Sequence, residues 1–424
     1  MKNRSFLREG FVVLMCILMH TVLHAQDSLT LTLQQVEQQF VAKNLQLLAA
    51  KYDIDIAKAQ VIQARLFNNP SVQISSALYN QDDHKLLDVS NSTGQYGISV
   101  QQLVTLAGKR NKQIKLAELN VAQSENAFFE LLRTLKFTLR SDFYNAYFLQ
   151  HSITAFTQQI NTLKQLDSTY SAFQSKGLVT LKDAVRIRSL LYSLQAQQTD
   201  MQNQWSDVQS ELQLLLQDNK NFIVPYVGGA QLDFTTPVLT LQQLLDTAYA
   251  NRYDLKIANT AVAYNQQNLA LQKALRVPDL TLGAEFDKKG SYINNASLLN
   301  AAIDLPFFNR NQGNIKAAKV SVDQSKALYT QQQSIVENDV QKAYGKMLNT
   351  QRMLQSFDPA FSNQYEQLMK GVVENFGKRN ISLIDFTDFV ESYRNNVLQF
   401  NQLQNDRRQA IESLNFAVGK SIIE

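Results

Sequence analysis

Residues 376–388, FGKRNISLIDFTD, separate two long helical patterns. Ser382 stands at a natural N-cap position, and Asp385, three residues later, completes a variant of the capping box. Gly377 and Asn380 are turn residues, so we expect one long helix to end near Phe376, the chain to reverse, and a second helix to begin at Ser382.

Asp388 lies one turn further along the second helix, on the same face as Asp385. Two like charges at this spacing slightly destabilise an isolated helix. Capping explains Asp385 at least in part, whereas it gives no reason for Asp388. A functional role is therefore expected first at Asp388.

The same turn occurs 202 residues earlier, as KGLVTLKD at residues 176–183. Thr180 and Asp183 take its two capping positions, and we expect capping to be the main role of Asp183. Arg186 stands where the later copy has Asp388, so the two copies differ in charge at this position.

A second repeat has an offset of 208 residues. The segment LTLQQ begins two further helical patterns, predicted over residues 31–68 and 239–276, and a proline follows each of them, at Pro70 and Pro278. These matches indicate a duplicated chain. The predicted divisions are a first structural repeat at 26–218, a linker at 219–238 and a second structural repeat at 239–424.

The N-terminus has the parts of a secretory signal peptide, predicted over residues 1–25. A basic segment is followed by an apolar run and by a plausible cleavage site before Gln26. The alternative, a membrane anchor, requires a longer apolar run. Cys16 lies in this segment, and lipidation of Cys16 stays open, although Met15 before it favours ordinary cleavage because a lipoprotein signal has a small residue there.

Composition limits the function classes. Only 6 prolines and 14 glycines in 424 residues favour long helices. Because Cys16 is the only cysteine, the mature chain has no thiol for catalysis or for a metal site. The net charge of +4 comes with no dense basic patch, which argues against nucleic acid as a partner.

Two predicted β-hairpins, at residues 71–105 and 279–305, alternate apolar and mostly polar side chains. The strands alone leave a membrane barrel and a small soluble sheet equally open. Four strands cannot close a barrel, since about eight is the minimum, and open sheet edges are not tolerated in lipid. A membrane interpretation therefore requires an oligomer that pools its strands.

Four long helical patterns complete the two halves, and they are predicted at 110–173, 180–217, 311–375 and 382–416. Their apolar residues recur in steps of three and four, which is the spacing of coiled coils. Each half is thus expected to run helix, β-hairpin, very long helix, turn and medium helix. Antiparallel helices of such length suit a tube better than a globular core.

With these elements, the chain resembles the TolC family of outer-membrane efflux channels over essentially its whole mature length. Within that family it looks closest to the CzcC/CusC-like branch that serves heavy-metal efflux pumps. The resemblance is carried by the two turns, LQQ at 33–35 with Pro70, LAGKR at 106–110, and LPFFNRNQG at 305–313.

The resemblance implies a mainly α fold with a transmembrane β-barrel. Three protomers would form one 12-stranded barrel in the outer-membrane lipid of a Gram-negative bacterium, continued by a helical periplasmic tunnel. It also implies two partners, a periplasmic adaptor and an inner-membrane pump. The protein would then be the passive exit duct of a tripartite efflux system.

The resemblance also assigns a periplasmic gate to Asp385 and Asp388, which match an acidic element that closes the channel in this family. Three copies of Asp388 around an axis would make a cation-favouring ring. Candidate latch or adaptor contacts surround the two turns: Lys176, Gly177, Asp183, Arg186, Gly377, Lys378 and Arg379.

An enzyme is not expected, and no cofactor, catalytic or metal-binding residues are assigned. After signal cleavage only His84 and His151 remain, far apart in sequence, and no catalytic triad or phosphate-binding loop is present. Two alternatives stay open: a non-channel periplasmic coiled-coil protein, and a duct for drugs or secreted proteins instead of heavy-metal cations. The pump, rather than the tube, would select the cargo.

Overall fold

The computed structural model describes residues 28–81, 83–228, 239–289, 293–356 and 361–423. The predicted signal peptide, with Cys16, and residues 229–238 of the predicted linker lie outside these ranges. Within them, no helix combines the length and the apolar character needed to cross a membrane.

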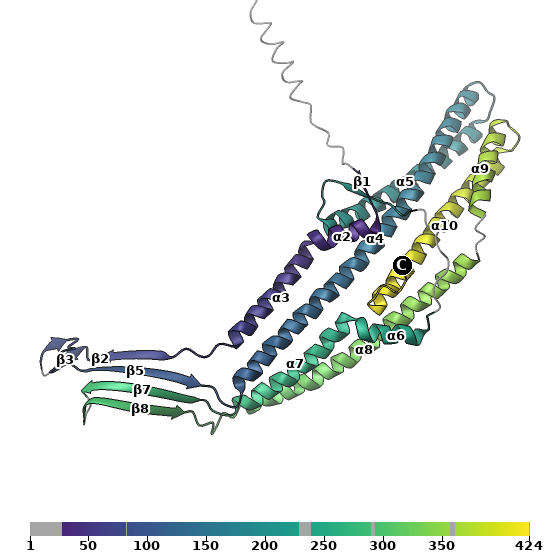
Figure 1. Cartoon of the computed structure of the whole chain (residues 1–424). Coiled ribbons are helices and arrows are strands. Elements are labelled where there is room, and N and C mark those ends of the chain that lie inside the picture. The colour runs from purple at the N-terminus through teal and green to yellow at the C-terminus, as the bar shows by residue number, and fades with distance from the viewer. Residues whose placement is uncertain (1–27, 82, 229–238, 290–292, 357–360, 424) are drawn as a thin grey trace, which may run out of the picture. The chain divides into compact units, whose positions relative to one another are not determined.

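The chain divides into two compact units, which are described separately (Figure 1). The turn unit contains both sequence-predicted turns and comprises residues 1–44, 135–236 and 347–412. The sheet unit comprises residues 45–134, 237–346 and 413–424. Each sequence repeat contributes to both units, so the units cut across the predicted repeats.

The sheet unit contains one four-stranded antiparallel sheet in the order β2-β5-β7-β8, visible in Figure 1. Its strands are β2 (Ser71–Ser76), β5 (Tyr96–Val104), β7 (Leu280–Lys289) and β8 (Asn294–Ile303). The strands fall within the two predicted hairpins, and β5 pairs with β7 to join them, with Val100 opposite Ala284. β2 and β8 are the two edges of the sheet.

Details of the first hairpin differ from the prediction. β2 has 6 residues rather than about ten. The segment between β2 and β5 contains a two-stranded ladder of β3 (Tyr79–Asn80) and β4 (Lys85–Leu86), which was not predicted. Each of these strands is only two residues long, which is too short for a strand pattern to be recognised among the polar residues of this segment.

The prediction of one continuous helix over residues 31–68 is wrong. The segment forms two helices, α2 (Leu33–Lys43) and α3 (Leu45–Ala64), separated at Asn44, whose backbone is extended at φ −63° and ψ 120°. The Asn44 side chain is buried and donates a hydrogen bond to the carbonyl oxygen of Leu215, 3.0 Å away, which fixes the break.

The predicted helix over 239–276 is broken at the equivalent position. α6 (Leu241–Asn251) and α7 (Tyr253–Leu275) meet at Arg252, with φ −68° and ψ 123°. Both broken helices begin with a capping box, formed by Thr32 with Gln35 and by Thr240 with Gln243. The two copies of the 208-residue repeat therefore share their helix caps and the positions of their helix breaks, and apolar periodicity does not reveal these breaks.

A short parallel sheet was missed in the turn unit. β1 (Ser28–Leu31) pairs with β6 (Phe222–Pro225), which lies inside the predicted linker. The buried side chain of Gln209 accepts a hydrogen bond from the Ile223 N–H and donates one to the Ile223 carbonyl oxygen, both at 2.7 Å. Part of the linker is thus fixed to the turn unit.

The long helices follow the prediction with one exception. α4 (Lys109–Ser175) is continuous over 67 residues, α5 is Leu181–Leu216 and α10 is Leu383–Val418. The predicted single helix over 311–375 is wrong, because α8 (Gln312–Gln355) and α9 (Phe361–Gly377) are separate helices. The sequence has Pro359 between them, and proline lacks the N–H that continues a helix.

Candidate functional site

The first turn, between α4 and α5, closes with a left-handed residue. Gly177 has φ +73°, a conformation that glycine adopts without steric cost. The Leu178 N–H donates to the Phe173 carbonyl oxygen (2.9 Å), the long bond of a Schellman motif. Thr180 then caps α5, since its hydroxyl oxygen accepts the Asp183 N–H at 3.1 Å.

The second turn, between α9 and α10, has the same bonds on different residues. The Asn380 N–H donates to the Asn375 carbonyl oxygen (2.9 Å), and the left-handed residue is Arg379, with φ +64°. Gly377 is the last residue of α9 and not the turn residue with positive φ. The predicted end of the first helix near Phe376 is confirmed, since α9 ends at Gly377, and the predicted turn residue Asn380 lies in the connection to α10.

The predicted capping of α10 is confirmed. The Ser382 hydroxyl accepts the Asp385 N–H at 3.1 Å and donates to the Asp385 carboxylate at 2.6 Å. Thr180 and Asp183 repeat this geometry, with the hydroxyl 2.7 Å from the carboxylate. Asp385 is thus held by its cap, as Asp183 is in the first turn.

Asp388 has a different environment. Its side chain is exposed on α10, and no hydrogen bond or ion pair of its carboxylate is found within the part of the chain that the structure describes. Lys378, a candidate partner, instead pairs with Glu374 on its own side of the turn, at 2.5 Å. Arg186 and Lys176 are exposed.

Aromatic rings join the segments beneath the two turns. The rings of Phe376 and Phe386 stack with centroids 4.0 Å apart, and Tyr170 stacks on Phe376 at 5.5 Å. The Arg379 guanidinium lies 5.0 Å from the centroid of the Phe173 ring, so it contacts the last part of α4. Of the candidate latch residues, Arg379 is the one seen to contact the other turn's helix.

Burial raises the pKa of Tyr170, and the negative charge of Asp183 adds to this shift while Arg379 opposes it.

The aromatic residues at α4 and α9 were missed as site residues by sequence reasoning. Phe173 and Phe376 precede their turns closely, and an aromatic residue before each turn is a signal that could have found them.

The described residues contain no group of three or more His, Cys, Asp or Glu side chains that could hold a metal ion. The acidic side chains at the turns are single exposed or capping groups within one protomer. What they can do chemically is attract cations and repel anions, not coordinate a fixed ion.

Residues 244–420 match the sequence profile of a family described as outer membrane efflux protein. A curated relative, the cobalt-zinc-cadmium resistance protein CzcC of Cupriavidus metallidurans, is 20% identical over 368 residues, which cover 84% of this chain and 82% of the relative. The chain therefore resembles outer membrane efflux proteins over residues 244–420 and resembles CzcC over most of its length. These similarities support an outer-membrane location and argue against the non-channel coiled-coil alternative.

Solved structures of channels share the fold of this chain. The outer-membrane channel OprN superposes with a TM-score of 0.73 at 16% identity, covering 91% of this chain and 89% of OprN. CusC gives 0.72 at 16% identity, covering 92% of both chains. The open-state MtrE channel of Neisseria gonorrhoeae gives 0.71 at 16% identity, covering 92% and 89%.

These similarities confirm the predicted fold class and the predicted resemblance to TolC-like channels. The TM-scores of OprN and CusC differ by too little to separate branches of the family by fold. The sequence match to CzcC is the observation that favours the predicted heavy-metal branch.

Proposed function

We propose that this chain is an outer-membrane efflux protein and that three copies of it form one passive exit duct. A periplasmic adaptor and an inner-membrane pump would deliver the cargo, and no catalytic step would occur in the duct. The observation that carries the proposal is a four-stranded sheet with two open edges in a chain that matches outer membrane efflux proteins over residues 244–420.

The open edges argue for the oligomer. β2 and β8 each have one neighbour, so one side of each strand has unpaired backbone groups. Lipid offers no hydrogen-bond partner for such groups, and a membrane sheet must therefore close on itself. Four strands per protomer are too few for this, whereas three protomers supply enough for a barrel.

An exposed apolar stripe on α3 supports the same assembly. Leu45, Leu48, Tyr52 and Ile56 recur at helical spacing and are 43–60% exposed. A stripe of this kind on a long helix requires an apolar partner surface. In the proposed trimer, helices of a neighbouring copy would cover it.

Asp388 is proposed as the main gate residue and Asp385 as a supporting one. The carboxylate of Asp385 is engaged by Ser382, whereas that of Asp388 is exposed and has no capping role. In a trimer with the α10 helices around the axis, three Asp388 carboxylates would form an acidic constriction that favours cations. Arg379 on Phe173 would hold the two turns of one protomer together.

The other charged or turn residues, Lys176, Gly177, Asp183, Arg186, Gly377 and Lys378, are proposed as adaptor contacts or turn formers. Lys176, Arg186 and Lys378 supply exposed positive charge at the two turns. An adaptor that docks there would therefore present acidic side chains. Arg379 would contribute to the latch as well as to this surface.

Heavy-metal cations are the proposed cargo, because the relative CzcC is a cobalt-zinc-cadmium resistance protein. Drugs and secreted proteins are the alternatives. A deletion strain grown on cobalt, zinc and cadmium salts and on a panel of antibiotics tests this choice. We expect sensitivity to the metal salts that a plasmid copy of the gene restores; sensitivity to antibiotics alone would overturn the metal assignment.

A further inference from the structure

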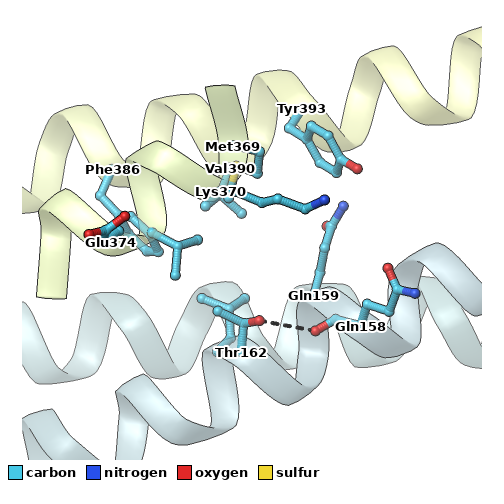
Figure 2. A pocket seen from close by; sticks show the side chains of 11 residues that line it. Gln158, Gln159, Thr162, Met369, Lys370, Glu374, Phe386, Val390 and Tyr393 are labelled. Carbon is cyan, nitrogen blue, oxygen red and sulfur yellow. Dashed lines mark hydrogen bonds between the residues drawn. The ribbon is translucent and has the colours of Figure 1, made fainter. Parts of the chain in front are cut away.

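A pocket in the turn unit lies between α4, α9 and α10 and has a volume of about 360 Å³ (Figure 2). Its apolar lining is contributed by Leu163 of α4, by residues of α9, and by residues of α10. The apolar side chains of α9 and α10 are Met369, Val373, Phe386 and Val390. The space is thus bounded by both helical hairpins of the turn unit.

Gln159 of α4 is the unusual residue of this pocket. Its side chain is 9% exposed, and neither its Nε2 nor its Oε1 has a hydrogen-bond partner within the described residues. Figure 2 shows the amide reaching into the pocket toward Lys370 and Tyr393. A buried amide with both polar atoms unmatched is unfavourable unless another molecule binds it.

Another buried glutamine of the turn unit shows the usual arrangement. The amide of Gln209 donates to and accepts from the backbone of Ile223, with both bonds at 2.7 Å. Its two polar atoms are therefore matched inside the protein. Gln159 is 9% exposed, against 1% for Gln209, and lacks such a partner among the described residues, so its amide is available to a ligand.

The chemistry of the pocket defines the ligand. An amide side chain offers one donor and one acceptor next to each other, and a primary carboxamide offers the complementary pair. The apolar lining and the rings of Phe386 and Tyr393 suit an aromatic or alkyl body. An α-helix is about 10 Å wide and does not fit into a space of this volume, which excludes a partner helix as occupant.

We propose that this pocket binds a small molecule with a primary carboxamide head on Gln159 and an apolar body against α9 and α10. A bound molecule contacts both hairpins at once and stabilises their present packing. In the duct proposed above, the ligand therefore opposes separation of the hairpins. This consequence for gating rests on the proposed function, whereas binding itself does not.

The test is calorimetric binding of 4-phenylbutanamide to the detergent-solubilised full-length protein. Two matched probes change only the head group: 5-phenylpentan-2-one, which only accepts hydrogen bonds, and 4-phenylbutanoate, which lacks a donor at neutral pH. We expect the amide to bind about tenfold more tightly than either, the difference of one matched hydrogen bond.

Variants locate the site. Gln159→Leu should bring the affinity ratio of amide to ketone to about one, while Gln158→Leu, an exposed neighbour at the rim, should leave it at about tenfold. Val373→Phe should fill the pocket and abolish binding of all three probes. The thermal unfolding midpoint of each variant shows that it has folded.

Three results would each overturn the proposal: no binding of the amide to the wild type, equal affinity for amide and ketone, or unchanged binding in a folded Val373→Phe variant. None of these measurements requires transport. Binding without any channel activity would therefore count against the duct alone, and channel activity without binding would count against this pocket alone.

Discussion

At the scale of single residues, the two turns show what local sequence can and cannot predict. Ser382 and Thr180 were predicted as caps, and both make the expected bonds, because capping depends on residues three apart. The residue with positive φ in the second turn was not predicted. Arg379, not a glycine, takes that conformation, and its contact with Phe173 comes from packing that a local motif does not encode.

Substitution of Gly177 and of Gly377 by alanine is therefore expected to change the stability of the protein in opposite directions. Gly177→Ala should destabilise the protein by about 1 kcal/mol, because a Cβ disfavours φ +73°. Gly377 has no positive φ and open space around it, so Gly377→Ala should be neutral or stabilising by up to about 1 kcal/mol. Chemical unfolding midpoints of the two variants check this, and equal shifts in one direction would contradict it.

Asp142 gives a pH prediction. It lies on α4, is buried, and has one carboxylate oxygen without a partner among the described residues. Burial, followed by the negative charge of Glu211 on α5, raises the pKa of Asp142 to about 7 from 3.8. Between about pH 4 and about pH 7 the Asp142 carboxyl group is therefore protonated in the folded state and ionised in the unfolded state. The free energy of unfolding consequently falls as the pH rises from about 4 through about 7.

Asp142→Asn should remove this part of the pH dependence and raise the unfolding midpoint at pH 8. Thermal unfolding of the full-length protein at pH 5 and pH 8 measures both effects. Asp200→Asn, an exposed change on α5, is the matched control and should not alter the difference between the two pH values. An unchanged pH dependence in Asp142→Asn would contradict the assigned role of this carboxyl group.

At the scale of elements, apolar periodicity predicted the existence of the long helices but not all of their breaks. The pattern continues through Asn44 and Arg252, where side-chain contacts from distant segments hold the extended backbone. The break between α8 and α9 is different, because Pro359 was visible in the sequence. β1 and β6 were missed because strands of four residues give too short a pattern.

Arg252 is expected to matter most among these breaks. Its buried guanidinium lies 2.9 Å from the Asp339 carboxylate and also pairs with Asp254 and with the Ala417 carbonyl oxygen. Arg252→Ala would remove a partner of the partly buried Asp254 carboxylate and of the buried Ala417 carbonyl oxygen, and should cost on the order of 2 kcal/mol of unfolding free energy. Arg276→Ala, at an exposed position beyond α7, is the control; a similar small loss for both would contradict the argument.

At the scale of the whole molecule, the sequence alone requires an oligomer only if the strands lie in a membrane, because four strands are too few to close a barrel and open sheet edges are not tolerated in lipid. The sequence could not fix the cargo, because in the proposed system selection belongs to the pump. It could not predict the pocket at Gln159 either. That pocket depends on how α9 and α10 pack against α4, which a single helical pattern does not encode.

The proposed trimer predicts a specific cross-linking pattern. Ile74 on β2 and Leu299 on β8 are exposed, and each lies on an open edge strand. In a variant with Ile74→Cys and Leu299→Cys, a flexible bifunctional thiol reagent should link neighbouring copies into dimers and trimers and into nothing larger. Each single variant should stay monomeric on denaturing gels; linked products above the trimer would contradict a closed ring of three.

The gate is tested most directly by the conductance of the purified protein in planar bilayers. We expect discrete channels, with Asp388→Ala widening the resting channel or making it leak more than Asp183→Ala does, since Asp183 serves as a helix cap. Higher resting conductance in Asp388→Ala than in Asp183→Ala and the wild type is the predicted result. Absence of channels, or equal conductance in all three proteins, would contradict the account of an outer-membrane duct gated at Asp388.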